Sequence, residues 1–212
     1  ATAPIFAVVG DESVSITEKT SIPTVDKQVR EGDAWGKVSD SYIGEEVEYK
    51  LTGSVASNID TFTKYEYTFQ DHLSVGLEAI KSSVKVTIND QVIQPANGYT
   101  VDLVDTKNAS GNLTGGQDLT ISFSNLKDAA AAAGVTLRGD SKVVVTYKAK
   151  LTDKAEYTAT GNTNDVKLVY SNNPMVEGTG TSTSERVTDH VFRLDVTKVE
   201  KGKESQKLEA TF

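Results

Sequence analysis

Hydrophobic and polar residues alternate along most of the chain with a period of two, which is typical of β-strands that bury one face. The alternation is clearest over residues 143–151, where every odd-numbered position from Val143 to Leu151 is hydrophobic. The same pattern predicts strands at residues 24–30, 45–55, 65–69, 84–88, 99–104, 119–123, 143–151, 155–160 and 166–172. Gly, Asn and Asp are frequent between these segments, as in turns. Regularly spaced strands with such turns predict an all-β sandwich.

One segment has a different composition. Residues 126–133 contain five consecutive alanines after Leu-Lys-Asp, and these are strong helix formers. Ser124 or Asn125 can cap the start of a helix here, and Gly134 can end it. We therefore expect one short helix.

The pattern divides the chain into an N-terminal segment, a sandwich domain and the start of a following β domain, with predicted bounds at residues 1–19, 20–186 and 187–212. A stretch rich in Gly, Thr and Ser at 178–184 precedes the third part. The alternation then resumes from Phe192 to Val196, and Lys198 is the next residue on that face. We expect the chain to be a fragment of a longer protein, with the second β domain truncated.

The first strand of the sandwich carries a lysine on its hydrophobic face. Val25, Lys27 and Val29 share one side of the strand, so a strand that buries the two valines also buries the lysine. A buried ammonium group is costly unless it has a partner or loses its proton. Lys27 therefore needs a buried polar partner or must lose its proton.

Two later strands supply candidate partners. Asp71 is in phase with the aromatic residues of its strand, and Asn172 is in phase with the apolar residues of its strand. Asn173 is the other candidate amide, but its opposite phase turns it outward. An inward lysine, carboxyl and asparagine are the reactants of a Lys–Asn isopeptide bond. The alternative is a plain buried salt bridge between Lys27 and Asp71, with Asn172 as a hydrogen-bond donor.

The expected reaction is an attack of the Lys27 amine on the side-chain amide carbon of Asn172, with loss of ammonia. Burial favours the neutral amine, which is the form that attacks. Asp71, kept protonated by the same surroundings, would polarise the amide carbonyl and shuttle protons. Fixed proximity of the reactants can lower such a barrier by about 7–11 kcal/mol. The bond forms once per molecule, so we do not expect an enzyme that acts on other substrates.

The composition excludes several other classes of function. The net charge is −8 with acidic residues spread along the chain, which is unlike a nucleic-acid-binding face or a basic membrane anchor. No apolar run reaches the roughly 20 residues of a membrane-spanning helix. The chain has no cysteine and two isolated histidines, so neither a zinc site nor a catalytic triad is predicted. We expect no metal and no cofactor.

Several motifs resemble a known family when they are taken in order. They are Val-Asp-Lys-Gln-Val at 25–29, Ile-Gly-Glu-Glu-Val-Glu-Tyr at 43–49, Tyr-Thr-Phe-Gln-Asp-His-Leu at 67–73, the strand at 143–151 and Tyr-Ser-Asn-Asn-Pro at 170–174. Together they resemble the isopeptide-forming middle domain of Gram-positive backbone pilins, of the collagen-adhesin A type, over roughly residues 20–176.

The resemblance implies an immunoglobulin-like β-sandwich with a lysine on the first strand, a central aspartate and an asparagine near the last strand. These map onto Lys27, Asp71 and Asn172. The segment after Phe192 is similar to the first strand of the next pilin domain, in which Lys198 would be the linking lysine. The partners of Lys198 would lie outside this chain.

The implied function is that of a structural shaft subunit of an extracellular, cell-wall-anchored pilus, joined to neighbouring subunits by a sortase. The chain departs from the family in having neither a Tyr-Pro-Lys motif nor a sorting signal. The alternative is a surface adhesin or ancillary pilin domain that binds a host receptor or matrix. The loop at 107–117 and the tripeptide Arg138-Gly139-Asp140 are the candidate ligand-binding segments.

Overall fold

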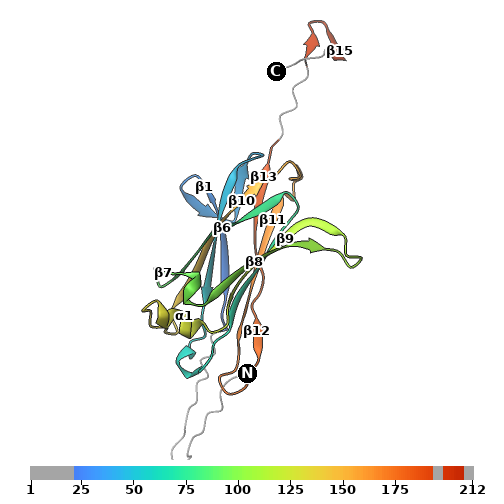
Figure 1. Ribbon diagram of the computed structural model, residues 1–212. Helices are drawn as coiled ribbons and strands as arrows, with labels where there is room; N and C mark the ends of the chain where they lie inside the picture. Colours follow the sequence, from blue (N-terminus) through green and yellow to red (C-terminus); the bar gives the residue numbers. More distant parts are fainter. Residues whose placement is uncertain (1–21, 193–197, 208–212) are drawn as a thin grey trace, which may run out of the picture.

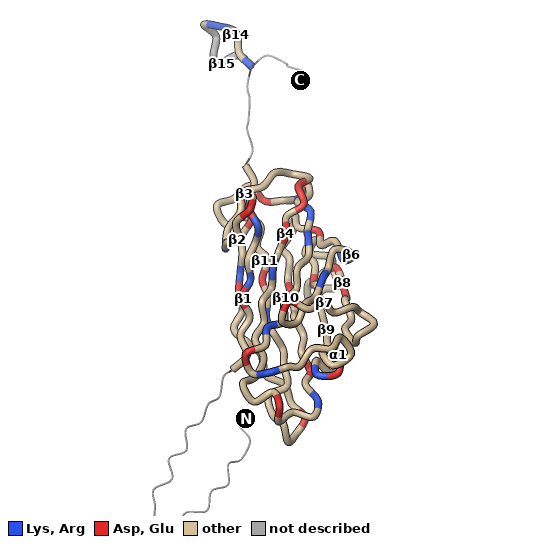
Figure 2. Tube along the Cα trace, turned by 90° about the vertical axis from the view of Figure 1, so that its left-hand side faces the viewer, with Lys and Arg blue, Asp and Glu red and all other residues tan. Residues whose placement is uncertain are grey.

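Two β-sheets pack face to face and enclose the hydrophobic side chains of the alternating segments (Figure 1). The computed structural model describes residues 22–192 and 198–207. The predicted N-terminal segment 1–19 and residues 193–197 of the predicted following domain lie outside the described residues. The chain enters the sandwich at one end and leaves it at the opposite end (Figures 1 and 2).

The first sheet has the order β2 (Ala34–Gly36), β1 (Val25–Glu31), β4 (Glu46–Ser54), β10 (Lys142–Leu151), β6 (Leu77–Ile88) and β7 (Gln91–Ile93). The second has the order β3 (Val38–Ser41), β13 (Glu185–Val191), β11 (Asn162–Ser171), β5 (Tyr67–Leu73), β9 (Leu113–Phe123) and β8 (Tyr99–Lys107), with β12 (Thr179–Thr181) also paired to β11. A separate hairpin joins β14 (Val199–Glu200) to β15 (Lys203–Lys207). Strand β13 runs parallel to β3, and the other described pairs are antiparallel.

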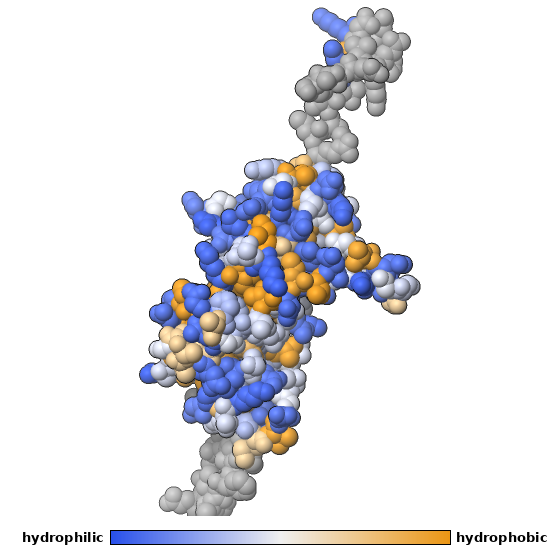
Figure 3. Space-filling view, viewed as in Figure 1, coloured by the Kyte–Doolittle hydropathy of each residue, from blue (hydrophilic) through white to orange (hydrophobic). Residues whose placement is uncertain are grey.

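The core lies between the two sheets and follows the alternation of the strands. In β4, buried and partly exposed residues alternate without interruption, and Tyr49 and Leu51 are completely buried. Phe69 and Ile121 supply buried side chains from the second sheet. Each fully buried side chain of this size contributes about 1.5–3 kcal/mol. On the face shown in Figure 3, hydrophilic residues predominate and hydrophobic residues form scattered groups.

The predicted helix is confirmed as α1 (Leu126–Ala132), which begins after a cap at Asn125. The Asn125 side chain accepts a hydrogen bond from the backbone amide of Lys127, which satisfies one of the free N–H groups of the first turn. The sandwich with one short helix therefore agrees with the sequence prediction. Within the described residues, no helix is long and apolar enough to cross a membrane.

Several segments differ from the sequence prediction. Strand β6 begins at Leu77, seven residues before the predicted start at 84, and β9 begins at Leu113, inside the predicted loop at 107–117. Residues 155–160 form a loop that ends in a turn instead of a strand, and β11 begins at Asn162, four residues before the predicted start at 166. Strand β13 crosses the predicted domain boundary at residue 187, because it pairs with β11 and β3 and buries Val187 and Val191. The sandwich thus extends at least to Val191.

Candidate functional site

A lysine from one sheet meets a carboxyl group and a carboxamide from the other sheet inside the sandwich. Lys27 lies on β1 of the first sheet, whereas Asp71 on β5 and Asn164 on β11 belong to the second. Their exposed fractions are 0%, 2% and 0%, respectively. The three groups are brought together because each occupies an inward position of its strand.

Hydrogen bonds join these groups through a fourth side chain, Tyr147 on β10. The Lys27 Nζ donates to Asp71 Oδ1 and, at 2.7 Å, to Asn164 Oδ1. The Asn164 Nδ2 donates to the Tyr147 hydroxyl at 2.6 Å, and that hydroxyl donates to Asp71 Oδ2. The amine, the carboxyl and the carboxamide therefore form a closed network.

Burial moves the proton affinities of the amine and the carboxyl toward each other. It lowers the pKa of Lys27 from 10.5 to about 8, although the neighbouring Asp71 opposes the shift. It raises the pKa of Asp71, although Lys27 opposes that shift. Both changes reduce the cost of passing a proton from the ammonium to the carboxylate, which gives a neutral amine and a neutral acid.

Two aromatic rings line the amine. The Tyr49 and Tyr147 rings are stacked with centroids 5.3 Å apart, and the Lys27 Nζ lies 5.5 Å and 5.7 Å from these centroids. The Tyr49 hydroxyl donates to a second buried carboxyl, Asp189, which also accepts from Ser39. Burial raises the pKa of Asp189. The two tyrosine rings thus border the site, and the hydrogen bond from Tyr49 to Asp189 connects it to β13, the last strand of the sandwich.

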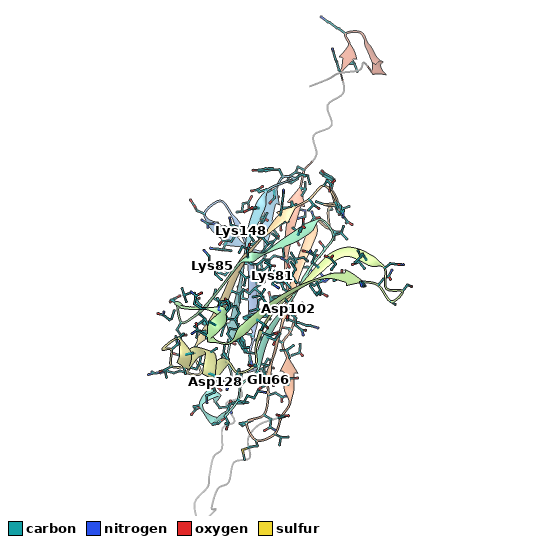
Figure 4. All side chains as sticks on the ribbon, in the orientation of Figure 1. Glu66, Lys81, Lys85, Asp102, Asp128 and Lys148 are labelled. Atoms are coloured by element: carbon teal, nitrogen blue, oxygen red, sulfur yellow. The ribbon has the colours of Figure 1, made fainter. Side chains whose placement is uncertain are left out.

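Other lysines of the sandwich have ordinary surface positions. Lys81, Lys85 and Lys148 are exposed on β6 and β10 (Figure 4). Lys198 is also exposed, and its predicted role as the linking lysine of a following domain remains a prediction. Lys27 differs from these four in being sealed away from solvent.

The structure places a different amide from the predicted Asn172 beside Lys27. Asn172 lies beyond the end of β11, where its Nδ2 donates to the Thr179 carbonyl at 3.0 Å, and Asn173 accepts from the backbone of the nearby loop. Asn172 is eight residues from Asn164, or about 26 Å along an extended strand. The amide within hydrogen-bond distance of Lys27 is that of Asn164.

Sequence reasoning missed Asn164 for a specific reason. Asn164 and Asn172 share the same strand phase, so alternation alone does not separate them. The run Gly161–Asp165 is rich in turn-forming residues and is easily taken for a loop. The pairing of β11 with β5 decides the matter, because it places Val166 opposite Asp71 and Asn164 one inward position beyond.

Comparisons with known structures place this fold among bacterial pilins. The major pilin GBS80 of Streptococcus agalactiae matches with a TM-score of 0.58 and 19% identity, covering 80% of this chain and 56% of that chain. The pilus backbone protein RrgB of Streptococcus pneumoniae matches with a TM-score of 0.51 and 25% identity, covering 73% and 54%. BcpA, the major pilin subunit of Bacillus cereus, matches with a TM-score of 0.53 and 18% identity, covering 80% and 40%.

The chain has the fold of Gram-positive backbone pilins. This similarity agrees with the resemblance found in the sequence motifs. The pilin-fold chain spans about half the length of the solved pilins it matches. No protein-family model and no curated protein sequence matches it.

Proposed function

We propose that this domain is a structural unit of a pilus shaft on the Gram-positive cell surface, cross-linked internally by an isopeptide bond between Lys27 and Asn164. The observation that carries the proposal is the sealed contact between the Lys27 amine and the Asn164 carboxamide, with the Asp71 carboxyl bound to the same amine. The fold similarity to major pilins supports the shaft role.

The reaction begins with a proton transfer. Lys27 Nζ passes one proton to Asp71 Oδ1, which leaves a neutral amine and a protonated carboxyl. The amine then attacks Cγ of Asn164, and the carbonyl oxygen takes up the negative charge. One proton leaves the attacking nitrogen, the departing nitrogen gains one, and the C–N bond to the original amide nitrogen breaks. The products are a Lys–Asn amide, one ammonia and a neutral Asp71, so protons and charge balance.

We propose a role for Asp71 that differs from the expected one and fits the hydrogen-bond geometry. Its two carboxyl oxygens bind the Lys27 amine and the Tyr147 hydroxyl, and the Asn164 carbonyl oxygen instead accepts from Lys27. In the proposed mechanism Asp71 is therefore first a base for the amine and later a source of the proton that leaves with ammonia. Holding the reactants in contact supplies the effective concentration that makes a poor amide electrophile react.

The bond would join the two sheets covalently, because Lys27 and Asn164 lie on opposite sheets. Such a link shrinks the unfolded ensemble as a disulfide does, and it is not reducible. This property suits a fibre that bears load outside the cell. Polymerisation by a sortase and attachment to the cell wall are part of the same proposal.

Intact-mass spectrometry of the purified chain tests the bond. The wild-type protein should weigh one ammonia less than its sequence mass, and tandem spectra should show the Lys27 peptide joined to the Asn164 peptide. Lys27→Ala and Asn164→Ala should each keep the full mass of their own sequence. Asn172→Ala, the matched control at the asparagine that shares the strand phase of Asn164, should still lose one ammonia.

A wild-type chain at full sequence mass would contradict the proposal. Lys27 and Asp71 would then be a plain buried salt bridge, with Asn164 as a hydrogen-bond partner. Ammonia loss that persists in Asn164→Ala but stops in Asn172→Ala would move the bond to residue 172.

A further inference from the structure

The Tyr147 hydroxyl touches all three reacting groups. It accepts a hydrogen bond from Asn164 Nδ2 at 2.6 Å, donates to Asp71 Oδ2 and lies 3.4 Å from Lys27 Nζ. Nδ2 is the nitrogen that must leave as ammonia, and its hydrogen-bond partner in this network is the Tyr147 oxygen. The carboxyl of Asp71 reaches the amide nitrogen through that hydroxyl.

We propose that Tyr147 is a catalytic residue of the cross-linking reaction, which relays a proton from Asp71 to the departing amide nitrogen of Asn164. This inference rests on the proposed isopeptide bond. In the relay step, the protonated Asp71 carboxyl rotates to present its proton at the oxygen that faces Tyr147. The Tyr147 hydroxyl gives its own proton to Nδ2 and takes the proton of Asp71. The Asp71 carboxylate then accepts a proton from the attacking Lys27 nitrogen, ammonia departs and the new amide is neutral. Tyr147 ends the step as it began.

The surroundings keep the hydroxyl protonated and fix its position. Burial raises the pKa of Tyr147 well above its ordinary value, so the residue acts as a neutral donor and acceptor instead of a phenolate. Its strand pairs Tyr147 with Tyr49, and the two rings stack. The Tyr49 hydroxyl donates to Asp189, whereas the Tyr147 hydroxyl donates to the reacting carboxyl of Asp71.

The relay also explains how the leaving group is protonated inside a dry core. An amide nitrogen is a poor leaving group until it gains a proton, and side chains that transfer protons in the transition state typically contribute about 10²–10⁴-fold in rate. The site is nearly without solvent exposure at Lys27, Asn164 and Tyr147. The Tyr147 hydroxyl therefore supplies the proton that a water molecule would otherwise have to give to the leaving nitrogen.

Timed mass spectrometry on newly made full-length chain tests the relay. Cell-free synthesis is stopped, samples are quenched in acid at intervals, and ammonia loss is scored per folded molecule from the protease-resistant fraction. Tyr147→Phe should lose ammonia at least 100-fold more slowly than wild type. Tyr67→Phe is the matched control, because it removes another buried hydroxyl, one that donates to the Ser54 carbonyl at 2.8 Å, and its rate should equal that of wild type.

The outcomes separate the relay from the bond itself. Slow but eventual ammonia loss in folded Tyr147→Phe supports the relay, because the bond still forms. Equal rates in Tyr147→Phe and Tyr67→Phe overturn the relay and leave the bond standing. Wild-type chain that never loses ammonia overturns the proposed bond and the relay with it. Should Tyr147→Phe fold poorly, the measurement is repeated in sucrose, which favours the compact state, and the same comparison decides.

Discussion

Pulling on the two ends of the sandwich should extend the cross-linked chain by only a small part of its length. The chain enters the sandwich through β1 at one end and leaves it after β13 at the other end (Figures 1 and 2). A bond between Lys27 and Asn164 would carry the load past residues 28–163, which could not lengthen. Residues 165–191 lie after the bond and are held by strand pairing and packing alone.

The structure sets the size of this extension. The segment 165–191 contains 27 residues, so at about 3.4 Å per residue it adds at most ~90 Å when pulled straight. Without the bond, residues 25–191 would all unravel, and their 167 residues would add at most about 570 Å. A bond at Asn172 would leave residues 173–191 free to extend, which is at most ~65 Å for 19 residues.

Single-molecule force spectroscopy distinguishes these lengths when the chain is placed between reference domains of known unfolding length. After the folded end-to-end distance is added to each measured step, wild-type steps should total ~90 Å, whereas steps of Asn164→Ala, which cannot form the proposed bond, should total about 570 Å. Steps of the full length in wild-type chain would refute the covalent bypass. Steps that total ~65 Å would place the bond at residue 172.

Two further predictions concern stability. A link between Lys27 and Asn164 closes a loop of 136 residues and should stabilise the fold by about 5 kcal/mol in the chain-entropy model. Calorimetry should therefore show that Asn164→Ala lowers the melting temperature by roughly 10–20 °C. An unchanged melting temperature would contradict the link. In that variant the free amine also makes stability depend on pH. Burial depresses the pKa of Lys27 from 10.5 to about 8, so between these values the unfolded chain binds a proton that the folded chain does not. The stability that Lys27 contributes is therefore fully present above pH 10.5 and is lost as the pH falls toward 8. In denaturant titrations, the free energy of unfolding of Asn164→Ala should fall by on the order of 3 kcal/mol between pH 10.5 and pH 8. The control is the same variant that also carries Lys27→Met and Asp71→Leu, and its free energy of unfolding should not fall in this way. Parallel pH profiles of the two proteins would contradict the prediction.

The sequence predicts the sandwich well because its strands carry a strong alternation. Lys27 and Asp71 can be placed inward from that alternation, since each follows hydrophobic residues in phase, and the structure buries both. The helix after Asn125 is equally accessible, because a cap and a run of alanines are local signals. These features depend on neighbours in sequence, which pattern reasoning can read.

The rest of the site depends on register between distant strands. Which asparagine faces Lys27 follows from the pairing of β11 with β5, which alternation does not specify. Tyr147 is readable as an inward residue, but its contact with Asn164 and Asp71 requires the two sheets to be stacked. The same holds for Asp189, which meets the hydroxyl of Tyr49 across the sandwich.

The energetics of the buried ion pair give a reason for the chemistry. A lysine and an aspartate with no solvent exposure cost several kcal/mol each to desolvate, and their attraction seldom repays that cost in full. Condensation with Asn164 would remove both charges, because the amine becomes a neutral amide and Asp71 keeps a proton. The burial that makes Lys27 an expensive core residue is thus the same burial that lowers its pKa and, in the proposed reaction, favours the neutral amine that attacks. Under the proposed mechanism, a fold that places such a lysine beside a carboxamide would relieve this cost by forming the bond, and the reaction would need no external catalyst.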